Sequence, residues 1–140
     1  MTNKPRVIAD TGVIVGLIYD RDQWREWTRE KAANLPVPYL TCEAVITEAC
    51  FLLHNISDGE QKVLEMIERG VLQVDFSLCD HLASIKALMK KYKNVPMSLA
   101  DACLVRMCEM IENSLVFTVD GDFLIYRKDG RKKIPLIHPD

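Results

Sequence analysis

Residues 6–12 read Arg6-Val7-Ile8-Ala9-Asp10-Thr11-Gly12, and this stretch decides the fold. A short β-branched run ends at once in a carboxylate, a hydroxyl and a glycine, and a second apolar run, Val13 to Tyr19, follows without a polar break. This order predicts a buried strand that turns directly into a helix, with Asp10 at the carboxyl edge of a sheet. Because ligands bind at that edge in open α/β sheets, Asp10 is the first candidate site residue.

The rest of the chain alternates between strand and helix patterns. Parallel strands covered by helices on both faces give this alternation. The sequence therefore predicts an α/β fold: a doubly wound three-layer α/β/α arrangement with a mostly parallel central sheet, and residues 1–140 as a single domain. The expected strands are 7–9, 39–40, 71–74, 115–119 and 134–137, and the expected helices are 11–19, 22–34, 42–54, 60–69, 77–92 and 98–112, with one helical turn at 122–126 and a turn at 128–131.

Polar residues and one glycine mark the expected ends of these helices. A short polar side chain at the first position can accept a hydrogen bond from a free backbone N–H. Glycine is favoured just after the last turn because it adopts a left-handed conformation at low cost. The expected caps are Asp22, Thr41, Ser57 or Asp58, Ser77 with Asp80, and Ser98, and the expected end is Gly70.

Composition excludes several classes of protein. The chain is 49% hydrophobic and 27% charged, which is typical of a soluble globular domain, and its length allows a real core. No apolar run reaches the roughly 18 residues needed to cross a bilayer. The first five residues lead into no signal-peptide core, so we expect a cytoplasmic protein without a membrane partner. A net charge of −2 gives no global attraction to nucleic acid.

The soft metal ligands of the chain are scattered. Five cysteines show no CxxC spacing, and no histidine lies within ligand spacing of another. Reduced thiols and ordinary histidines are the expectation, and a zinc site is not.

Four carboxylates stand in apolar surroundings. Asp10 and Asp120 each end a hydrophobic strand, and Asp101 lies within the run Leu99-Ala100-Asp101-Ala102-Cys103-Leu104-Val105. On a helix, Glu48 shares a face with apolar residues at three and four positions. We expect this face to be buried, where an ionised carboxylate is costly unless it is paired or bound to a metal. The neighbours of Glu48 on this face are Ala44, Val45, Phe51 and Leu52.

Each acid also has a purely structural interpretation. Asp10 and Asp120 could cap the helices that follow them, Glu48 could form an ion pair, and Ser98 and Asp101 have the spacing of a capping box. Four acids in such positions favour a common site, because clustered carboxylates repel unless a cation lies between them. Oxygen ligands without a nearby histidine or cysteine cluster favour Mg²⁺ or Mn²⁺, which suits phosphodiester hydrolysis.

Four motifs, in their order along the chain, resemble the PIN domain. The similarity is greatest to the small prokaryotic type that includes the VapC toxins, and it spans roughly residues 6 to 138. The motifs are Val7-Ile8-Ala9-Asp10-Thr11-Gly12, Thr47-Glu48-Ala49, Leu99-Ala100-Asp101-Ala102 and Phe117-Thr118-Val119-Asp120-Gly121-Asp122-Phe123.

The resemblance implies a Mg²⁺- or Mn²⁺-dependent ribonuclease with an α/β/α fold. It implies catalytic roles for Asp10, Glu48, Asp101 and Asp120, of which Asp10, Asp101 and Asp120 hold the metal. Thr11, Thr118 and Asp122 are implied as supporting residues. The implied partners are an RNA substrate, an antitoxin protein and a second copy of the chain. The basic tail follows the Asp120 loop directly, and its candidates for RNA contacts are Arg127, Lys128, Arg131 and Lys132.

Two features depart from the family pattern. Residues 20–24 lack the histidine that many VapC-type members carry there, and the tail after Tyr126 is unusually basic. An RNA-processing role stays open beside the toxin role, and so does a catalytically weak module that binds nucleic acid or protein. A receiver-type phosphoacceptor would need a pair of acids after the first strand, and a haloacid-dehalogenase-type phosphatase would need an aspartate where Gly12 stands.

Overall fold

Five parallel strands form the central sheet of the computed structural model, which describes residues 4–140. The strand order is β3-β2-β1-β4-β7, so the chain starts in the middle of the sheet and winds outward in both directions. The strands are β1 (Arg6–Ala9), β2 (Tyr39–Thr41), β3 (Leu72–Val74), β4 (Ser114–Phe117) and β7 (Leu136–Ile137).

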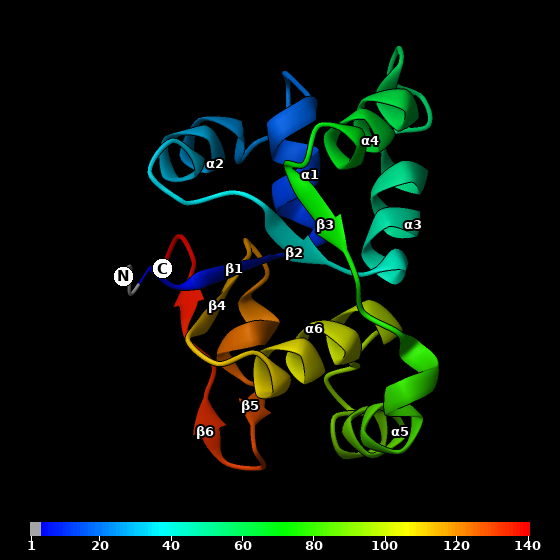
Figure 1. The fold of residues 1–140 in the computed structure, drawn as a ribbon, viewed down its shortest axis with the longest axis vertical. Helices are drawn as coiled ribbons and strands as arrows, with labels where there is room; N and C mark the ends of the chain where they lie inside the picture. The colour runs from blue at the N-terminus through cyan, green and yellow to red at the C-terminus, as the bar shows by residue number, and fades with distance from the viewer. Residues whose placement is uncertain (1–3) are drawn as a thin grey trace.

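Helices cover both faces of this sheet (Figure 1). The first face carries α1 (Thr11–Ile18), α2 (Arg25–Ala32), α3 (Glu43–Leu52) and α4 (Gly59–Glu68). The second carries α5 (Leu82–Lys91), α6 (Leu99–Met110) and a small antiparallel hairpin of β5 (Arg127–Lys128) and β6 (Lys132–Lys133). Two short 3₁₀ helices, η1 (Leu78–His81) and η2 (Gly121–Leu124), complete the elements. The expected three-layer α/β/α fold is confirmed.

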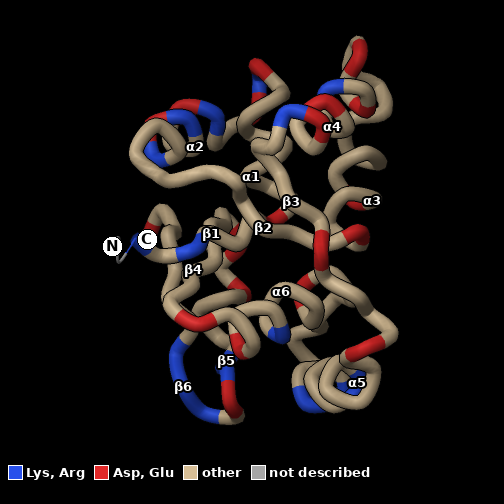
Figure 2. The backbone as a smooth tube through the Cα atoms, in the orientation of Figure 1, with Lys and Arg blue, Asp and Glu red and all other residues tan. Residues whose placement is uncertain are grey.

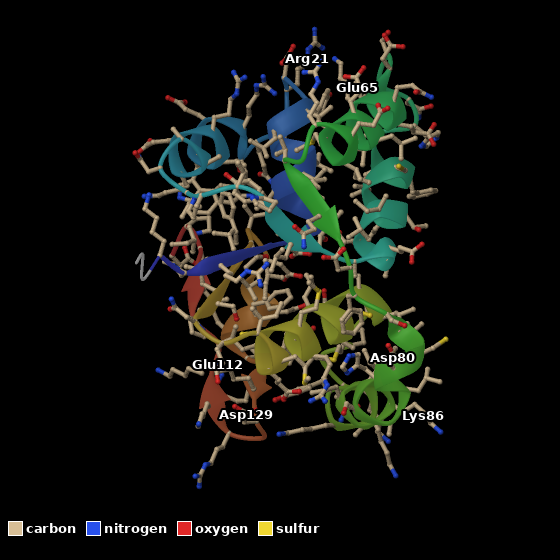
Figure 3. The ribbon with its side chains drawn as sticks, viewed as in Figure 1. Arg21, Glu65, Asp80, Lys86, Glu112 and Asp129 are labelled. Atoms are coloured by element: carbon tan, nitrogen blue, oxygen red, sulfur yellow. The ribbon has the colours of Figure 1, made fainter. Side chains whose placement is uncertain are left out.

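The register of the two central strands sets up the carboxyl edge of the sheet. Ala9 pairs with Phe117, so the next residues, Asp10 and Thr118, leave the sheet side by side. The apolar residues of both strands belong to the core, because they pack between the two helical layers. Charged side chains elsewhere point away from the molecule, as the labelled Arg21 and Glu65 show in Figure 3.

Gly12 lets helix α1 approach the end of β4 closely. A Cβ at this position would lie 2.6 Å from Cγ2 of Val119, which is far inside normal contact. Gly12→Ala is therefore expected to lower the free energy of unfolding by about 1–3 kcal/mol, despite the better helix propensity of alanine. Gly121→Ala is the matched control, because nothing lies within 4 Å of its Cβ position. Urea unfolding measures both, and equal stability of the two variants would contradict this interpretation.

Some of the expected caps form and others do not. Ser98 accepts a hydrogen bond from the Asp101 N–H, and Gly70 follows α4 with a φ of +76°. Thr41 does not cap α3, because its hydroxyl donates to the Ala9 carbonyl on the neighbouring strand. Asp22 instead accepts from Trp24 in a turn before α2, which begins only at Arg25.

One further difference lies in the second half of the chain. Ser77 makes no capping hydrogen bond, and residues 78–81 form the separate 3₁₀ helix η1 before α5 begins. The turn expected at residues 128–131 is confirmed, and it forms the tip of the β5–β6 hairpin, where Asp129 and Gly130 both have positive φ. All five cysteines are free thiols. Within residues 4–140, no helix has the length and apolar character that a membrane span requires.

Candidate metal centre

Three aspartates converge at the carboxyl edge of the sheet, on the side of α6. Asp101 lies in the first turn of α6, Asp120 follows β4, and Asp122 lies in η2. One carboxylate oxygen of each lies within 4.8 Å of the other two. Such spacing allows a single cation to contact all three side chains. Asp122, expected only as a supporting residue, is therefore a full member of this cluster.

Asp120 and Asp10 also cap the elements that follow them. Asp120 accepts a hydrogen bond from the Asp122 N–H at the start of η2, and Asp10 accepts one from Thr11 at the start of α1. The structural and functional interpretations of the sequence are thus compatible, because capping orients a carboxylate without using up all its lone pairs. The N-terminal ends of α1 and α6 also direct partial positive charge toward this edge.

Asp10 lies beside the cluster rather than inside it. Its Oδ1 accepts from the Thr11 N–H at 2.7 Å, and its Oδ2 accepts from the Thr118 hydroxyl at 2.7 Å. Burial raises the pKa of Asp10 to about 7, and the charges of Asp101 and Asp120 act in the same direction while the two hydrogen bonds oppose it. Asp10 is therefore electrostatically linked to the cluster, although it does not belong to the group of three.

Glu48 reaches the same site from the opposite helical layer. Its side chain is exposed, and Phe51 and Leu52 are 68% and 54% exposed, although Val45 is fully buried. The expectation of a buried helical face was therefore wrong for the half of the face that carries Phe51 and Leu52. Partial burial nevertheless raises the pKa of Glu48, and the charges of Asp101 and Asp120 add to this. Glu48 thus lies at the open rim of the site, within range of its charge.

Thr118 connects two of the acids through one hydroxyl. Its Oγ1 donates to Asp10 Oδ2 and accepts from the Asp120 N–H at 2.9 Å, and the side chain is fully buried. Both partners would be left unsatisfied by an apolar replacement. The hydroxyl therefore fixes the ends of β1 and β4 relative to each other.

Thr118→Val is expected to lower the free energy of unfolding by about 1–3 kcal/mol, because it leaves a buried donor and a buried acceptor without partners. We also expect a roughly 10- to 100-fold loss of metal affinity from the disturbed acids. Thermal unfolding and Mn²⁺ titration measure the two effects. Thr118→Ser keeps the hydroxyl, and Mn²⁺ binding as weak as that of the valine variant would show that the hydroxyl is not the cause.

No cationic side chain among residues 4–140 forms an ion pair with the acids of this site. Residues 4–140 form two ion pairs, Arg25 with Asp20 and Arg106 with Glu109, and neither involves the site. Burial and neighbouring carboxylates raise the pKa values of Asp101 and Asp122 as well. A divalent cation would remove this repulsion, and an all-oxygen donor set suits Mg²⁺ or Mn²⁺.

Thr11 adds an independent sign that the site has room for a ligand. Its hydroxyl oxygen is buried and has no hydrogen-bond partner, although it lies near enough to Glu48 to favour the ionised form of that acid. Buried polar atoms are usually satisfied by protein, water or an ion. The residues present therefore fit a hydrated divalent cation.

Tyr126 is a site residue that sequence reasoning missed. Its phenol donates a hydrogen bond to Asp101 Oδ2 at 2.8 Å, and the ring is completely buried. The two residues are 25 positions apart, so no local spacing could have revealed the contact. The only sequence signal was a tyrosine just before the basic tail.

The basic tail forms the β5–β6 hairpin at one end of the molecule (Figure 2). Lys128 pairs with Lys132 across the hairpin, and Lys91 of α5 donates to the Gly130 carbonyl at its tip. The last turn of α5, which carries Lys90 and Lys91, thus contacts the basic hairpin. Arg127 differs from the others, because its guanidinium donates to three backbone carbonyls, those of Leu124, Ile125 and Tyr126.

A shallow groove leads along α3 and the start of α6 to Glu48. It has a volume of about 500 Å³, and the exposed side chains of Phe51 and Leu99 form its apolar walls. The groove also contacts Ala44, Thr47, Ser98 and Ala100. Glu48 is therefore accessible from a surface that has apolar as well as charged character.

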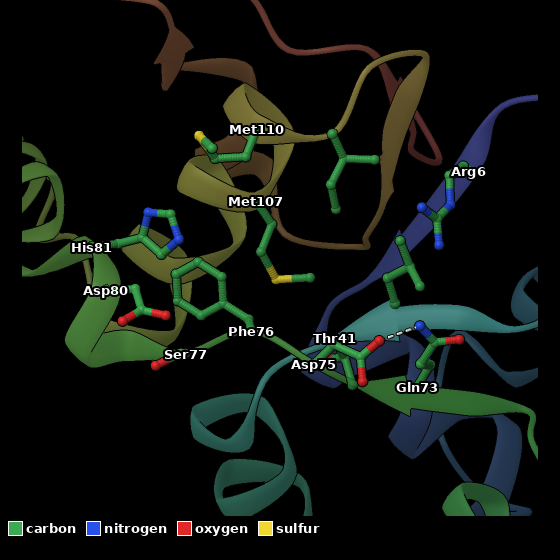
Figure 4. Close-up of a pocket in the computed structure, with 12 residues that line it drawn as sticks. Arg6, Thr41, Gln73, Asp75, Phe76, Ser77, Asp80, His81, Met107 and Met110 are labelled. Atoms are coloured by element: carbon green, nitrogen blue, oxygen red, sulfur yellow. Dashed lines mark hydrogen bonds between the residues drawn. The ribbon is translucent and has the colours of Figure 1, made fainter.

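A separate cavity of about 290 Å³ lies beyond the other end of α6 (Figure 4). Phe76 stacks on His81 at one side, with Met107 beside them, and Gln73 donates to Asp75 at the other. None of the clustered acids lines it. It therefore lies outside the site built from Asp101, Asp120 and Asp122.

Comparison with known proteins agrees with this geometry. A family model, the PIN domain, matches residues 7–129, a range that includes every acid described above. No curated protein matches the chain significantly. PIN domains are in general nucleases that use divalent metal ions, which is the chemistry that the acidic cluster supports. A matching fold, a matching acidic edge and a match over most of its length show that this chain belongs to the PIN domain family.

Proposed function

We propose that this protein is a Mg²⁺- or Mn²⁺-dependent endoribonuclease that hydrolyses phosphodiester bonds in RNA. The observation that carries the proposal is the set of carboxylates gathered at one sheet edge, with which no cationic side chain in the described part of the chain forms an ion pair. The proposed metal ligands are Asp101, Asp120 and Asp122, with Asp10 adjoining them. When bound, the cation would supply positive charge for the phosphate oxygens and acidify a water molecule.

The chain's own residues have distinct proposed tasks. Glu48 is the acid at the rim of the site, and its raised pKa makes it a better proton acceptor than an ordinary glutamate. Asp10 is buried with both oxygens hydrogen-bonded, so in its ionised form it contributes negative charge to the site rather than contact with substrate. Thr118 and Thr11 orient these two acids.

We propose a single RNA strand as substrate. The groove beside Glu48 offers apolar walls at Phe51 and Leu99, on which unstacked bases could lie. Lys128, Arg131 and Lys132 on the hairpin would attract phosphates. Arg127 was grouped with them, but its guanidinium is bound to backbone carbonyls, which limits it to a smaller share in RNA binding.

Cleavage of a labelled single-stranded RNA tests the proposal. We expect cleavage with Mn²⁺ or Mg²⁺, none with EDTA, and recovery when the metal is restored. A duplex RNA and a DNA of the same sequence serve as comparison substrates, and we expect both to be cleaved more slowly. RNA bound but left uncut under all metal conditions would instead support the alternative, a PIN module that binds nucleic acid or protein without catalysis.

We further propose that the protein is VapC-like and acts in the cytoplasm, as the toxin of a toxin–antitoxin pair. Exposed apolar residues on α3 and α4 favour this setting, because they offer a surface for an antitoxin or a second copy of the chain. These residues are Phe51, Leu52 and Leu64. A short neighbouring gene whose product co-purifies with the protein and blocks cleavage would support the toxin role. Its absence would favour an RNA-processing enzyme.

A further inference from the structure

Tyr126 makes the one direct tyrosine contact with the acidic cluster among residues 4–140. Its hydroxyl lies 2.8 Å from Asp101 Oδ2, and no part of the residue is exposed. Burial and the neighbouring acid charges raise the pKa of the Tyr126 phenol well above its usual value. The phenol is therefore the donor, and Asp101 is the acceptor of a strong O–H···O⁻ hydrogen bond.

The ring that carries this hydroxyl is fixed on several sides. Tyr126 packs edge-on against Tyr92 and Phe123, with ring centroids 5.1 and 5.2 Å away. Its backbone is fixed as well, because the Arg127 guanidinium donates to the Tyr126 carbonyl at 3.0 Å. The hydroxyl is thus held in place before any ligand arrives.

The hydrogen bond from Tyr126 opposes the effects that favour the protonated form of Asp101. Burial and the charge of Asp120 both raise its pKa, whereas the hydrogen bond from Tyr126 lowers it. A carboxylate with one oxygen held by a donor has fewer orientations available, so less conformational freedom is lost when a cation binds. A donor at Oδ2 therefore both orients Asp101 and favours its ionised form.

We propose that Tyr126 is a positioning residue of the metal centre, which holds Asp101 in the orientation that binds the cation. This inference rests on the proposed function, since it assumes that Asp101 is a metal ligand. Tyr126 itself does not contact the cation. The hairpin that follows it then has a role besides RNA contact, because the Arg127 guanidinium holds the backbone on which the phenol sits.

The chain supplies a matched pair of variants for the test. Tyr126→Phe keeps the buried ring and removes only the hydroxyl bound to Asp101. Tyr92→Phe removes a hydroxyl from the same aromatic cluster, but that hydroxyl accepts from Arg127 and makes no hydrogen bond to an acid. If loosened packing alone reduced the Mn²⁺ affinity, both variants would lose affinity to the same extent.

Mn²⁺ affinity of the full chain is the direct measurement, from the electron paramagnetic resonance signal of free Mn²⁺. We expect Tyr126→Phe to bind Mn²⁺ roughly 10- to 100-fold more weakly than the parent, and Tyr92→Phe to bind within about twofold of it. The Mn²⁺-induced rise in Tm gives a second measurement, taken relative to each variant's own metal-free Tm. It should shrink for Tyr126→Phe alone.

Asp101→Asn separates failure of the inference from failure of the proposed function. If Asp101→Asn abolishes Mn²⁺ binding while Tyr126→Phe binds like the parent, the positioning role is wrong and the metal site stands. Equal weakening by the two tyrosine variants also rules out the positioning role. If Asp101→Asn itself binds Mn²⁺ like the parent, the proposed metal site is wrong, and the inference fails with it.

Discussion

Asp101→Asn is expected to reduce metal-dependent RNA cleavage on the order of 1,000-fold. A metal ion contributes several kcal/mol to the stabilisation of charge in the transition state, and each 1.4 kcal/mol is a factor of ten in rate. Asparagine is nearly the same size and can still accept the hydrogen bond from Tyr126, so the fold should survive. Initial cleavage rates with Mn²⁺, measured beside circular dichroism spectra, give the result.

The control for this substitution is another acid near the same sheet edge. Asp80→Asn removes an exposed carboxylate in η1 that lies outside the cluster, and it should leave the rate unchanged. Equal rates for Asp101→Asn and the parent would point to a contaminating nuclease. A rate lost equally in both variants would show that general negative charge, rather than the cluster, matters.

The second large effect concerns stability, and here the substitution is expected to stabilise the protein. Asp10→Asn should make the metal-free protein more stable at alkaline pH while it weakens cleavage. The reason is that burial raises the pKa of Asp10 from 3.8 to about 7. Above its folded pKa the buried carboxyl must ionise, which disfavours the folded state.

The direction of the pH dependence follows from proton binding. Between pH 3.8 and about 7 the folded protein holds a proton on Asp10 that the unfolded chain has released. Stability contributed by this group therefore falls as pH rises through that window, in total by on the order of 4 kcal/mol. Asparagine does not titrate, so this contribution to the pH dependence disappears in the variant.

Urea unfolding in EDTA at pH 5 and pH 8 measures this effect. We expect the stability advantage of Asp10→Asn over the parent to grow by about 3 kcal/mol between the two pH values. Added Mn²⁺ should restore much of the parent's stability at pH 8, because the cation offsets the buried charge. An advantage that stays constant between pH 5 and pH 8 would show that Asp10 is ionised throughout.

The strands and the clustered aspartates could be predicted because local sequence determines them. Runs of β-branched residues that stop at Asp10 and Asp120 predict buried parallel strands, and the register of β1 and β4 then brings the two acids to one edge. Ser98 capped its helix as expected, since a capping hydrogen bond spans only three residues. Local rules were sufficient for these features.

The failures concern features that depend on distant partners. Phe51 and Leu52 suggested a buried face around Glu48, but periodicity cannot distinguish a core face from the wall of an open groove. Thr41 was expected to cap α3, but its hydroxyl donates instead to a backbone carbonyl of the neighbouring strand. Tyr126 could not be paired with Asp101 from the sequence, because their contact exists only once the fold is formed.

A crystal soaked in Mn²⁺ tests the central claim most directly. The account predicts an anomalous peak between α6 and η2, within about 2.0–2.4 Å of carboxylate oxygens from at least two of Asp101, Asp120 and Asp122. The phenol of Tyr126 should still hold Asp101 in that complex. A Mn²⁺-saturated crystal with no peak at this cluster, or with its only peak on other residues, would contradict the account.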